Sequence, residues 1–259
     1  MFIDYEPGDI FLVPGDSTLI VQVDIDDTNY QIDSLQFEGE IADICQYLQH
    51  KYTRFQQTQI RSTRNLVDAT DLSIFSSKLD SMAAKELAFL AEQEVFSTLP
   101  EWFVNFEKTD ILYQKAYLKR SNAYNRDLPE SYHDRIPFNN DAAMFSYYYY
   151  LYLTAYINEV GQLPPNGPAI SDPNYAPYHQ KQMALADSLL EGGAHDVFMT
   201  RSIFNILQKE KLDLAASLLD EYEGRFSSKK YARFLKMQLK IRKENELSWS
   251  YANFLARFS

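Results

Sequence analysis

Short apolar runs separated by turn signals occupy the first 38 residues of the chain, and this pattern is typical of strands. The clearest alternation covers residues 19–25, where every second side chain is apolar. Shorter strands are predicted over residues 10–13 and 35–37, and Pro-Gly turns precede the first two strands. Three strands of this length predict a small sheet whose edges need cover from something larger.

From Gly39 onward, apolar residues recur every three or four positions, and this spacing predicts helices. Candidate N-caps and Pro and Gly breaks divide the pattern, and the longest break covers residues 161–173. A polar, proline-containing loop is predicted over residues 124–139. The predicted helices cover about residues 40–57, 71–96, 99–123, 140–159, 175–191, 196–208, 211–223, 228–243 and 248–257.

These elements predict a mainly α fold, with the helices arranged as an antiparallel bundle or an array of hairpins beside a small N-terminal β element. We expect the β element to cover residues 1–38 and the helical domain to cover residues 39–259. Consecutive short helices after residue 196 favour antiparallel hairpins of the kind stacked in helical repeats, but their spacing is irregular and matches no named repeat.

Composition and charge exclude several classes of protein and partner. The chain has 259 residues, which is enough for a full core without disulfides or metals. Its 36 acidic and 25 basic residues give a net charge of −11, which disfavours binding to nucleic acid or anionic lipid. The single cysteine, Cys45, allows no internal disulfide and is expected to be buried. No apolar run has the length of a transmembrane helix, and no secretory signal pattern opens the chain.

No set of residues in the sequence identifies a reaction. The eight glycines form no phosphate-binding loop, and the four histidines form no HExxH motif. The dipeptides His133-Asp134 and His195-Asp196 leave open a helical metal-dependent phosphohydrolase, because such enzymes use His-Asp pairs as metal ligands. In the simpler interpretation Asp196 caps the start of its own helix and His133 lies in a polar loop. We therefore expect no enzyme activity, no metal and no cofactor.

Four consecutive tyrosines at residues 147–150 are the most unusual feature of the sequence. Because they point all round a helix, they predict a central helix that is surrounded on most sides. The alternative is an aromatic surface that binds a sugar or a peptide. The candidate binding residues are then Trp102, Tyr124, Tyr147, Tyr148, Tyr149 and Tyr150.

Short motifs over residues 10–48 follow an order that is found in one family. The order is a strand ending in Pro-Gly-Asp-Ser (residues 10–17), an alternating strand ending at Asp24, the segment Leu35-Gln36-Phe37-Glu38-Gly39, and a helix with Asp43, Tyr47 and Leu48. This region resembles the junction between the N-terminal β-domain and the helical domain of exported, TlpA-like bacterial thiol-disulfide oxidoreductases with a long region before their thioredoxin domain. The helices that follow are similar in order and length.

The resemblance implies a non-catalytic region, because this chain contains no CxxC pair and no βαβ pattern of a thioredoxin domain. It also implies a place in the periplasm or cell envelope, with the signal segment absent from this chain; without the resemblance we would expect a cytoplasmic protein. We expect an accessory domain of a thioredoxin-like oxidoreductase that binds a protein client or partner. The alternatives are the sugar- or peptide-binding module and the metal-dependent phosphohydrolase.

Overall fold

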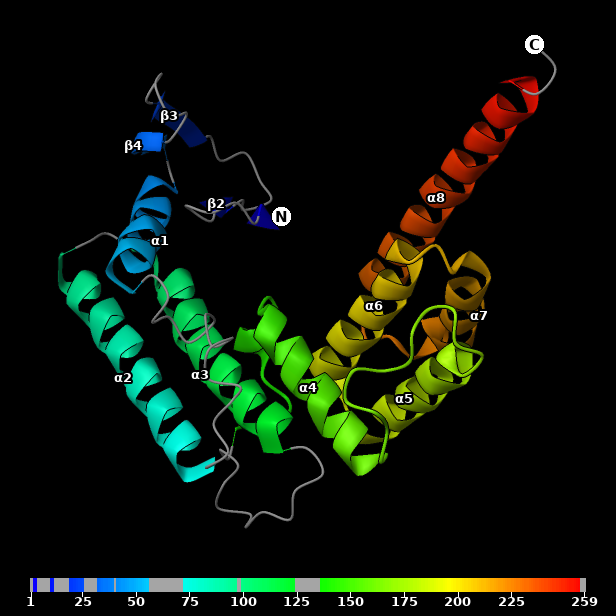
Figure 1. Cartoon of the computed structure of the whole chain (residues 1–259), viewed down its shortest axis with the longest axis horizontal. Helices are drawn as coiled ribbons and strands as arrows, with labels where there is room; N and C mark the ends of the chain where they lie inside the picture. The colour runs from blue at the N-terminus through cyan, green and yellow to red at the C-terminus, as the bar shows by residue number, and fades with distance from the viewer. Residues whose placement is uncertain are drawn as a thin grey trace. The chain divides into compact units, whose positions relative to one another are not determined.

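The fold is mainly helical, as the sequence predicts (Figure 1). A computed structural model describes the backbone of residues 2–3, 10–11, 19–25, 32–39, 41–55, 72–96, 99–123 and 136–256. Side chains are described for residues 37–39, 41–55, 72–92, 99–122, 136–140 and 142–244. Within these ranges the chain forms eight α-helices and four short strands.

The strands pair into two small antiparallel ladders. Strand β1 (Phe2–Ile3) pairs with β2 (Ile10–Phe11), and β3 (Leu19–Ile25) pairs with β4 (Ile32–Gly39). The predicted strand over residues 19–25 is confirmed at both ends, whereas the one predicted over residues 35–37 extends in both directions to form β4. Strand β1, which is two residues long, was not predicted because two residues show no period.

The chain forms two compact units, Met1–Lys115 and Ala116–Ser259. Their boundary lies within helix α3 (Glu101–Ala123). The change from strands to helices lies much earlier, between the end of β4 at Gly39 and the start of α1 (Ala42–Phe55), which is where the sequence predicts it. The predicted metal-ligand candidates His133 and Asp134 lie outside the described residues.

The core of the first unit contains aromatic side chains from α1, α2 (Leu72–Phe96) and α3. The ring of Tyr47 stacks on Phe89 and meets Phe103 edge to face, and both pairs of ring centroids are 5.5 Å apart. Cys45 is buried in the same cluster, as predicted. Such aromatic pairs add to the free energy that burial of their apolar area supplies.

A buried charge cluster borders this core. Lys51 Nζ lies 2.6 Å from a carboxylate oxygen of Glu86 and 2.6 Å from one of Glu107, and both carboxylates are almost fully buried. The Tyr47 hydroxyl donates a hydrogen bond to Glu107 over 3.2 Å. Burial lowers the pKa of Lys51, but the charges of Glu107 and Glu86 outweigh it and the net pKa is raised. Burial, and then Glu107, raise the pKa of Tyr47.

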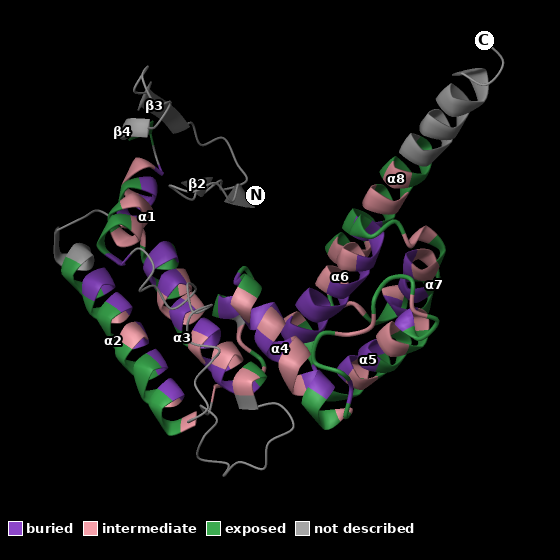
Figure 2. Cartoon of the chain, in the orientation of Figure 1, coloured by how far each residue is buried: buried purple, intermediate pink, exposed green. Residues whose placement is uncertain are grey.

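In the second unit α6 (Gly192–Gln208) is the central helix. It contacts α4 (Tyr147–Val160), α5 (Tyr175–Leu189), α7 (Leu212–Tyr222) and α8 (Lys229–Ala256). Figure 2 shows buried residues on several sides of α6. The prediction that the tyrosine helix is the central one is therefore wrong. The prediction that it is surrounded on most sides is confirmed, because residues 148–158 of α4 are buried or half-buried, whereas Tyr147 at the start of the helix is half exposed.

Three boundaries in this unit differ from the predicted ones. Helix α4 begins after Ser146, whose hydroxyl accepts the Tyr149 N–H over 3.1 Å, and only a short 3-10 helix (Asp141–Ala143) occupies the predicted start. Helix α6 begins at Gly192 instead of residue 196, and Gly192 takes a φ of +54°, a backbone conformation that favours glycine at this first position. Helix α8 replaces two predicted helices, since residues 244–246 are polar but the stretch between the two contains neither Gly nor Pro.

The remaining short element is a 3-10 helix over Glu223–Arg225, between α7 and α8. None of the helices in the described part of the chain combines the length and the apolar character needed to cross a membrane.

Candidate binding surface

Aromatic side chains lie exposed where α4 begins. The Ser146 cap fixes the first helical turn, so that Tyr147 points outward while Tyr149 and Tyr150 point into the second unit. Phe145, in the turn before the cap, is 75% exposed, and Tyr147 is 52% exposed. Neighbouring exposed rings of this kind are a feature of interaction sites.

Arg201 of α6 lies against these rings. Its guanidinium carbon is 5.8 Å from the ring centre of Tyr147 and 5.9 Å from that of Tyr150, within the range of a cation–π contact. Its Nη2 also donates a hydrogen bond to the Phe145 carbonyl over 3.2 Å. We call Phe145, Tyr147 and Arg201, supported from beneath by Tyr150, the aromatic–arginine surface.

Tyr150 is held rigidly beneath this surface. Its hydroxyl lies 3.3 Å from Ser202 Oγ and accepts a hydrogen bond from the Asn205 side-chain amide over 3.2 Å. Its ring packs on Phe198, with centroids 5.7 Å apart. The ring beneath the surface is therefore ordered before any ligand arrives, and this lowers the entropy cost of binding.

The electrostatics keep Tyr147 in its neutral form. Burial, followed by Tyr150 and Tyr117, raises the pKa of Tyr147, and the positive charge of Arg201 opposes the rise. At neutral pH the phenol therefore keeps its proton and can donate a hydrogen bond beside the guanidinium.

The structure brings only some of the predicted binding residues together. The ring centroid of Tyr148 lies 6.1 Å from that of Tyr147 and 6.4 Å from that of Tyr117, whereas Tyr149 is fully buried and donates its hydroxyl hydrogen to the Phe138 carbonyl. Trp102 is half exposed on α3 and belongs to the first compact unit, where its ring meets Phe103. Tyr124 lies outside the described residues.

Sequence reasoning missed Arg201 and did not single out Phe145. Arg201 lies 56 positions after Phe145, and nothing in its local sequence distinguishes it from any other basic residue on a helix. Phe145 directly precedes the capping serine, so recognising Ser146 as the N-cap would have placed this ring outside the helix.

Comparisons with protein-family models, curated proteins and solved structures found no match.

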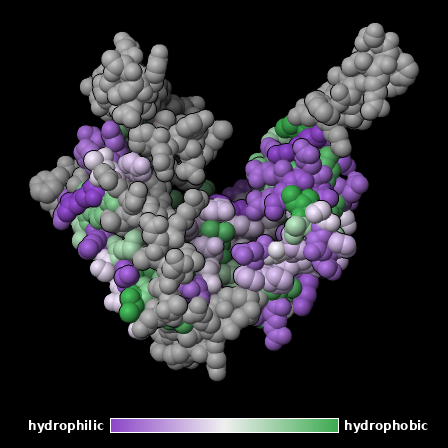
Figure 3. All heavy atoms as spheres, in the orientation of Figure 1, coloured by the Kyte–Doolittle hydropathy of each residue, from purple (hydrophilic) through white to green (hydrophobic). Residues whose placement is uncertain are grey.

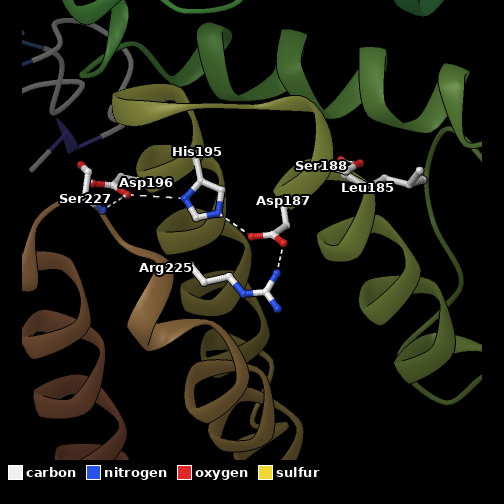
Figure 4. Close-up of polar contacts among 7 residues, drawn as sticks. All are labelled: Leu185, Asp187, Ser188, His195, Asp196, Arg225 and Ser227. Carbon is white, nitrogen blue, oxygen red and sulfur yellow. Dashed lines mark hydrogen bonds and ion pairs between the residues drawn. The ribbon is translucent and has the colours of Figure 1, made fainter.

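The second predicted His-Asp pair joins two helices of the second unit (Figure 4). Asp196 is fully buried and accepts hydrogen bonds from the Ser227 N–H over 2.9 Å, the Ser228 N–H over 3.3 Å and the Ser227 hydroxyl. These groups directly precede α8. The expectation that Asp196 caps its own helix is thus wrong, because its carboxylate binds the N–H groups at the start of another helix.

His195 lies between two carboxylates. Its Nε2 is 3.2 Å from Asp187 Oδ1, its Nδ1 is 3.5 Å from Asp196 Oδ1, and Asp187 also pairs with Arg225. Within this cluster the Ser227 hydroxyl donates to Asp196 and not to His195, so the arrangement lacks the contact by which a histidine activates a serine. Among the described residues, no group of three or more His, Cys, Asp or Glu side chains could hold a metal ion.

His179 on α5 gives a testable pH dependence. Burial, followed by the positive charge of Lys209, lowers the pKa of His179 to about 4, and a hydrogen bond with Gln182 opposes this. Above pH 6.5 the imidazole is neutral in both states. As pH falls from 6.5 towards 4, the unfolded chain binds a proton that the folded chain excludes, and stability should fall by about 2 kcal/mol.

Chemical denaturation at pH 7.5 and pH 4.5 measures this loss. His179→Gln should remove about 2 kcal/mol of the difference between the two pH values, whereas His50→Gln, at an exposed position of α1, should leave it unchanged. Equal pH dependence in the wild type and His179→Gln would show that the native state protonates His179 normally.

Proposed function

We propose that the chain is a non-catalytic interaction domain that binds a protein partner or client through the aromatic–arginine surface. The resemblance of residues 10–48 to TlpA-like proteins supports a partner that belongs to a thiol-disulfide oxidoreductase system of the cell envelope. The chain then acts by holding this partner and not by transferring electrons, because Cys45 is its single cysteine and is buried.

One observation carries the proposal: Phe145 and Tyr147 are exposed beside a guanidinium that the fold holds in place. Aromatic residues and arginine are enriched at protein interfaces and supply most of their binding energy. Two exposed rings next to one cation suit a peptide segment that offers an apolar or aromatic side chain together with a carboxylate.

A sugar is the alternative ligand, since the half-exposed ring of Tyr147 could stack on a sugar face. The two ligands make different demands on Arg201. A carboxylate-bearing peptide needs its charge, whereas a neutral sugar needs only hydrogen-bond donors and would bind Arg201→Gln nearly as well as the wild type.

Peptide display against the full chain tests the proposal. We expect enriched peptides that carry an aromatic and an acidic residue, and each of Arg201→Ala and Tyr147→Ala should weaken their binding by about tenfold or more, measured by isothermal titration calorimetry. Ile170→Ala, at an exposed apolar position between α4 and α5, serves as the matched control and should bind normally. The thermal unfolding midpoints should change little, because Tyr147 is half exposed and Arg201 is partly exposed.

The proposal fails if no peptide is enriched over background, or if the enriched peptides bind the two variants as tightly as the wild type. Tight binding of glycans by the wild type and by Arg201→Gln alike would replace the peptide with a sugar.

A further inference from the structure

The first half of α8 is strongly basic within an acidic chain. Residues 229–243 contain no Asp or Glu, although acidic residues outnumber basic ones by 36 to 25 in the whole sequence. The basic side chains in this segment are Lys229, Lys230, Arg233, Lys236, Lys240, Arg242 and Lys243. Lys236 pairs with Glu223 and Lys240 pairs with Glu244, both as exposed ion pairs. The segment still keeps a local excess of positive charge, which favours a partner of opposite charge.

An exposed apolar stripe runs along the same segment. Phe234, Met237 and Ile241 are 38%, 52% and 43% exposed, whereas Leu235 is fully buried against the body of the second unit. The spacing of three and then four residues places the three exposed side chains on one side of the helix. Figure 3 shows hydrophobic residues next to hydrophilic ones over the described part of α8.

The apolar stripe has a basic edge. At 3.6 residues per turn, Arg233 and Lys240 lie within about 60° of Met237 around the helix axis, on the side away from Leu235. In heptad terms Phe234 and Ile241 occupy a positions, Met237 a d position, and Arg233 and Lys240 the two g positions. Charges at g positions decide which partner helix is accepted.

The apolar stripe adjoins the aromatic–arginine surface. The ring of Phe234 packs on Phe204 of α6, with centroids 5.6 Å apart. Phe204 lies three residues after Arg201, on the same side of α6. The two exposed regions therefore belong to one side of the second unit, and a single partner can contact both.

We propose that residues 229–243 of α8 dock an amphipathic helix of a protein partner, whose apolar residues pack on Phe234, Met237 and Ile241 and whose Asp or Glu residues pair with Arg233 and Lys240. This inference rests on the proposed function, because it names the structural class of the partner. Three apolar anchors spaced along about two turns are the pattern by which one helix recognises another.

Charge argues against two other occupants. A second copy of this chain would bring an identical basic row to the interface and a further net charge of −11. An anionic lipid surface would attract the basic row, but the same net charge opposes the approach of the whole chain to it. Both occupants remain distinct outcomes of the experiment.

A designed peptide of about 21 residues, with Leu at a and d positions and Glu at e and g positions, is the probe. The matched probe carries Lys in place of every Glu. Binding of each labelled peptide to the full chain is followed by fluorescence anisotropy at one fixed ionic strength. We expect the Glu peptide to bind at least about tenfold more tightly than the Lys peptide.

Charge reversal on the helix identifies the contact. Arg233→Glu/Lys240→Glu should weaken the Glu peptide about tenfold or more and should improve binding of the Lys peptide, because the charge pattern is now inverted. The control variant Lys181→Glu/Lys243→Glu changes the net charge by the same amount as Arg233→Glu/Lys240→Glu. Lys181 lies on α5 and Lys243 lies about 160° from Ile241 around α8, so this control should bind like the wild type. Met237→Glu should weaken both peptides.

Four results would overturn the inference. The first is equal binding of the two peptides, and the second is unchanged binding of the Glu peptide to Arg233→Glu/Lys240→Glu. The third is an equal loss of affinity in the control variant. The fourth is that the chain binds no peptide but forms a dimer, or a complex with phosphatidylglycerol vesicles, that Met237→Glu abolishes. If peptides selected on the aromatic–arginine surface still bind Arg233→Glu/Lys240→Glu while the designed helix fails, the proposed function stands and only the identity of the partner is wrong.

Discussion

Replacing Asp196 with alanine should lower the free energy of unfolding by about 3 kcal/mol, because a fully buried carboxylate that holds three donors is lost. The two N–H groups of Ser227 and Ser228 would lose their acceptor at the start of α8, where a helix has no internal partner for them. His195 would also lose its contact with Asp196, 3.5 Å away.

Chemical denaturation at pH 7.5 measures the loss. Ser227→Ala is the matched control, because it removes one hydroxyl donor and keeps both N–H groups on the carboxylate, and it should cost only about 1 kcal/mol. A loss for Asp196→Ala no larger than that for Ser227→Ala would mean that water replaces the carboxylate without cost, and that the His-Asp pair does not hold α8 to α6.

The same variant links stability to the proposed function. Asp196 is one contact between α6, which carries Arg201, and the start of α8, which carries the basic row and the apolar stripe. Asp196→Ala should therefore loosen α8 relative to α6. The designed helical peptide contacts α8 alone and should lose less affinity than a partner that spans both helices.

The local sequence pattern was sufficient to predict those helices and strands for which the apolar spacing and the residues at the ends agree. Helices predicted over about 71–96 and 99–123 are confirmed as α2 and α3 within two residues at each end, because a long apolar period coincides with Pro100 and Glu101 at the start of α3. Strand β3 is confirmed at both ends because apolar side chains occupy every second position from Leu19 to Ile25. Where a signal was weak, as in the polar residues 244–246, a break was predicted inside what is one helix.

The candidate site depends on contacts that no local pattern contains. The four tyrosines at residues 147–150 were recognised as unusual, but contacts with distant segments decide which of them are buried, with α6 packed on Tyr150 and the Phe138 carbonyl hydrogen-bonded to Tyr149. Arg201 joins the site through its packing on Tyr147 and Tyr150, and its own neighbours in sequence carry no sign of this. The same holds for Asp196, whose hydrogen-bond partners lie 31 and 32 positions away. Long-range partners of this kind require the tertiary structure.

Lys51→Met should lower the free energy of unfolding by about 3–5 kcal/mol, which is the usual cost of removing one partner from a buried ion pair. Glu86 and Glu107 are 1% and 4% exposed, and Lys51 Nζ lies 2.6 Å from each carboxylate. Without the ammonium group, two negative charges would share one poorly solvated site. Lys78→Met, on the exposed side of α2, is the matched control and should change stability by no more than about 0.5 kcal/mol.

A triple variant separates charge from packing in this cluster. Lys51→Met/Glu86→Gln/Glu107→Gln keeps the side-chain volumes similar and removes all three charges, and Tyr47 can still donate its hydrogen bond to the amide at position 107. Because buried ion pairs can often be replaced at little net cost, the triple variant should recover most of the stability that Lys51→Met loses. Chemical denaturation of the wild type, Lys51→Met, Lys78→Met and the triple variant shows whether lost charge pairing or lost packing causes the destabilisation. If the triple variant is as unstable as Lys51→Met, the loss comes from the packing of the lysine stem, and the two carboxylates do not repel each other when the ammonium group is absent.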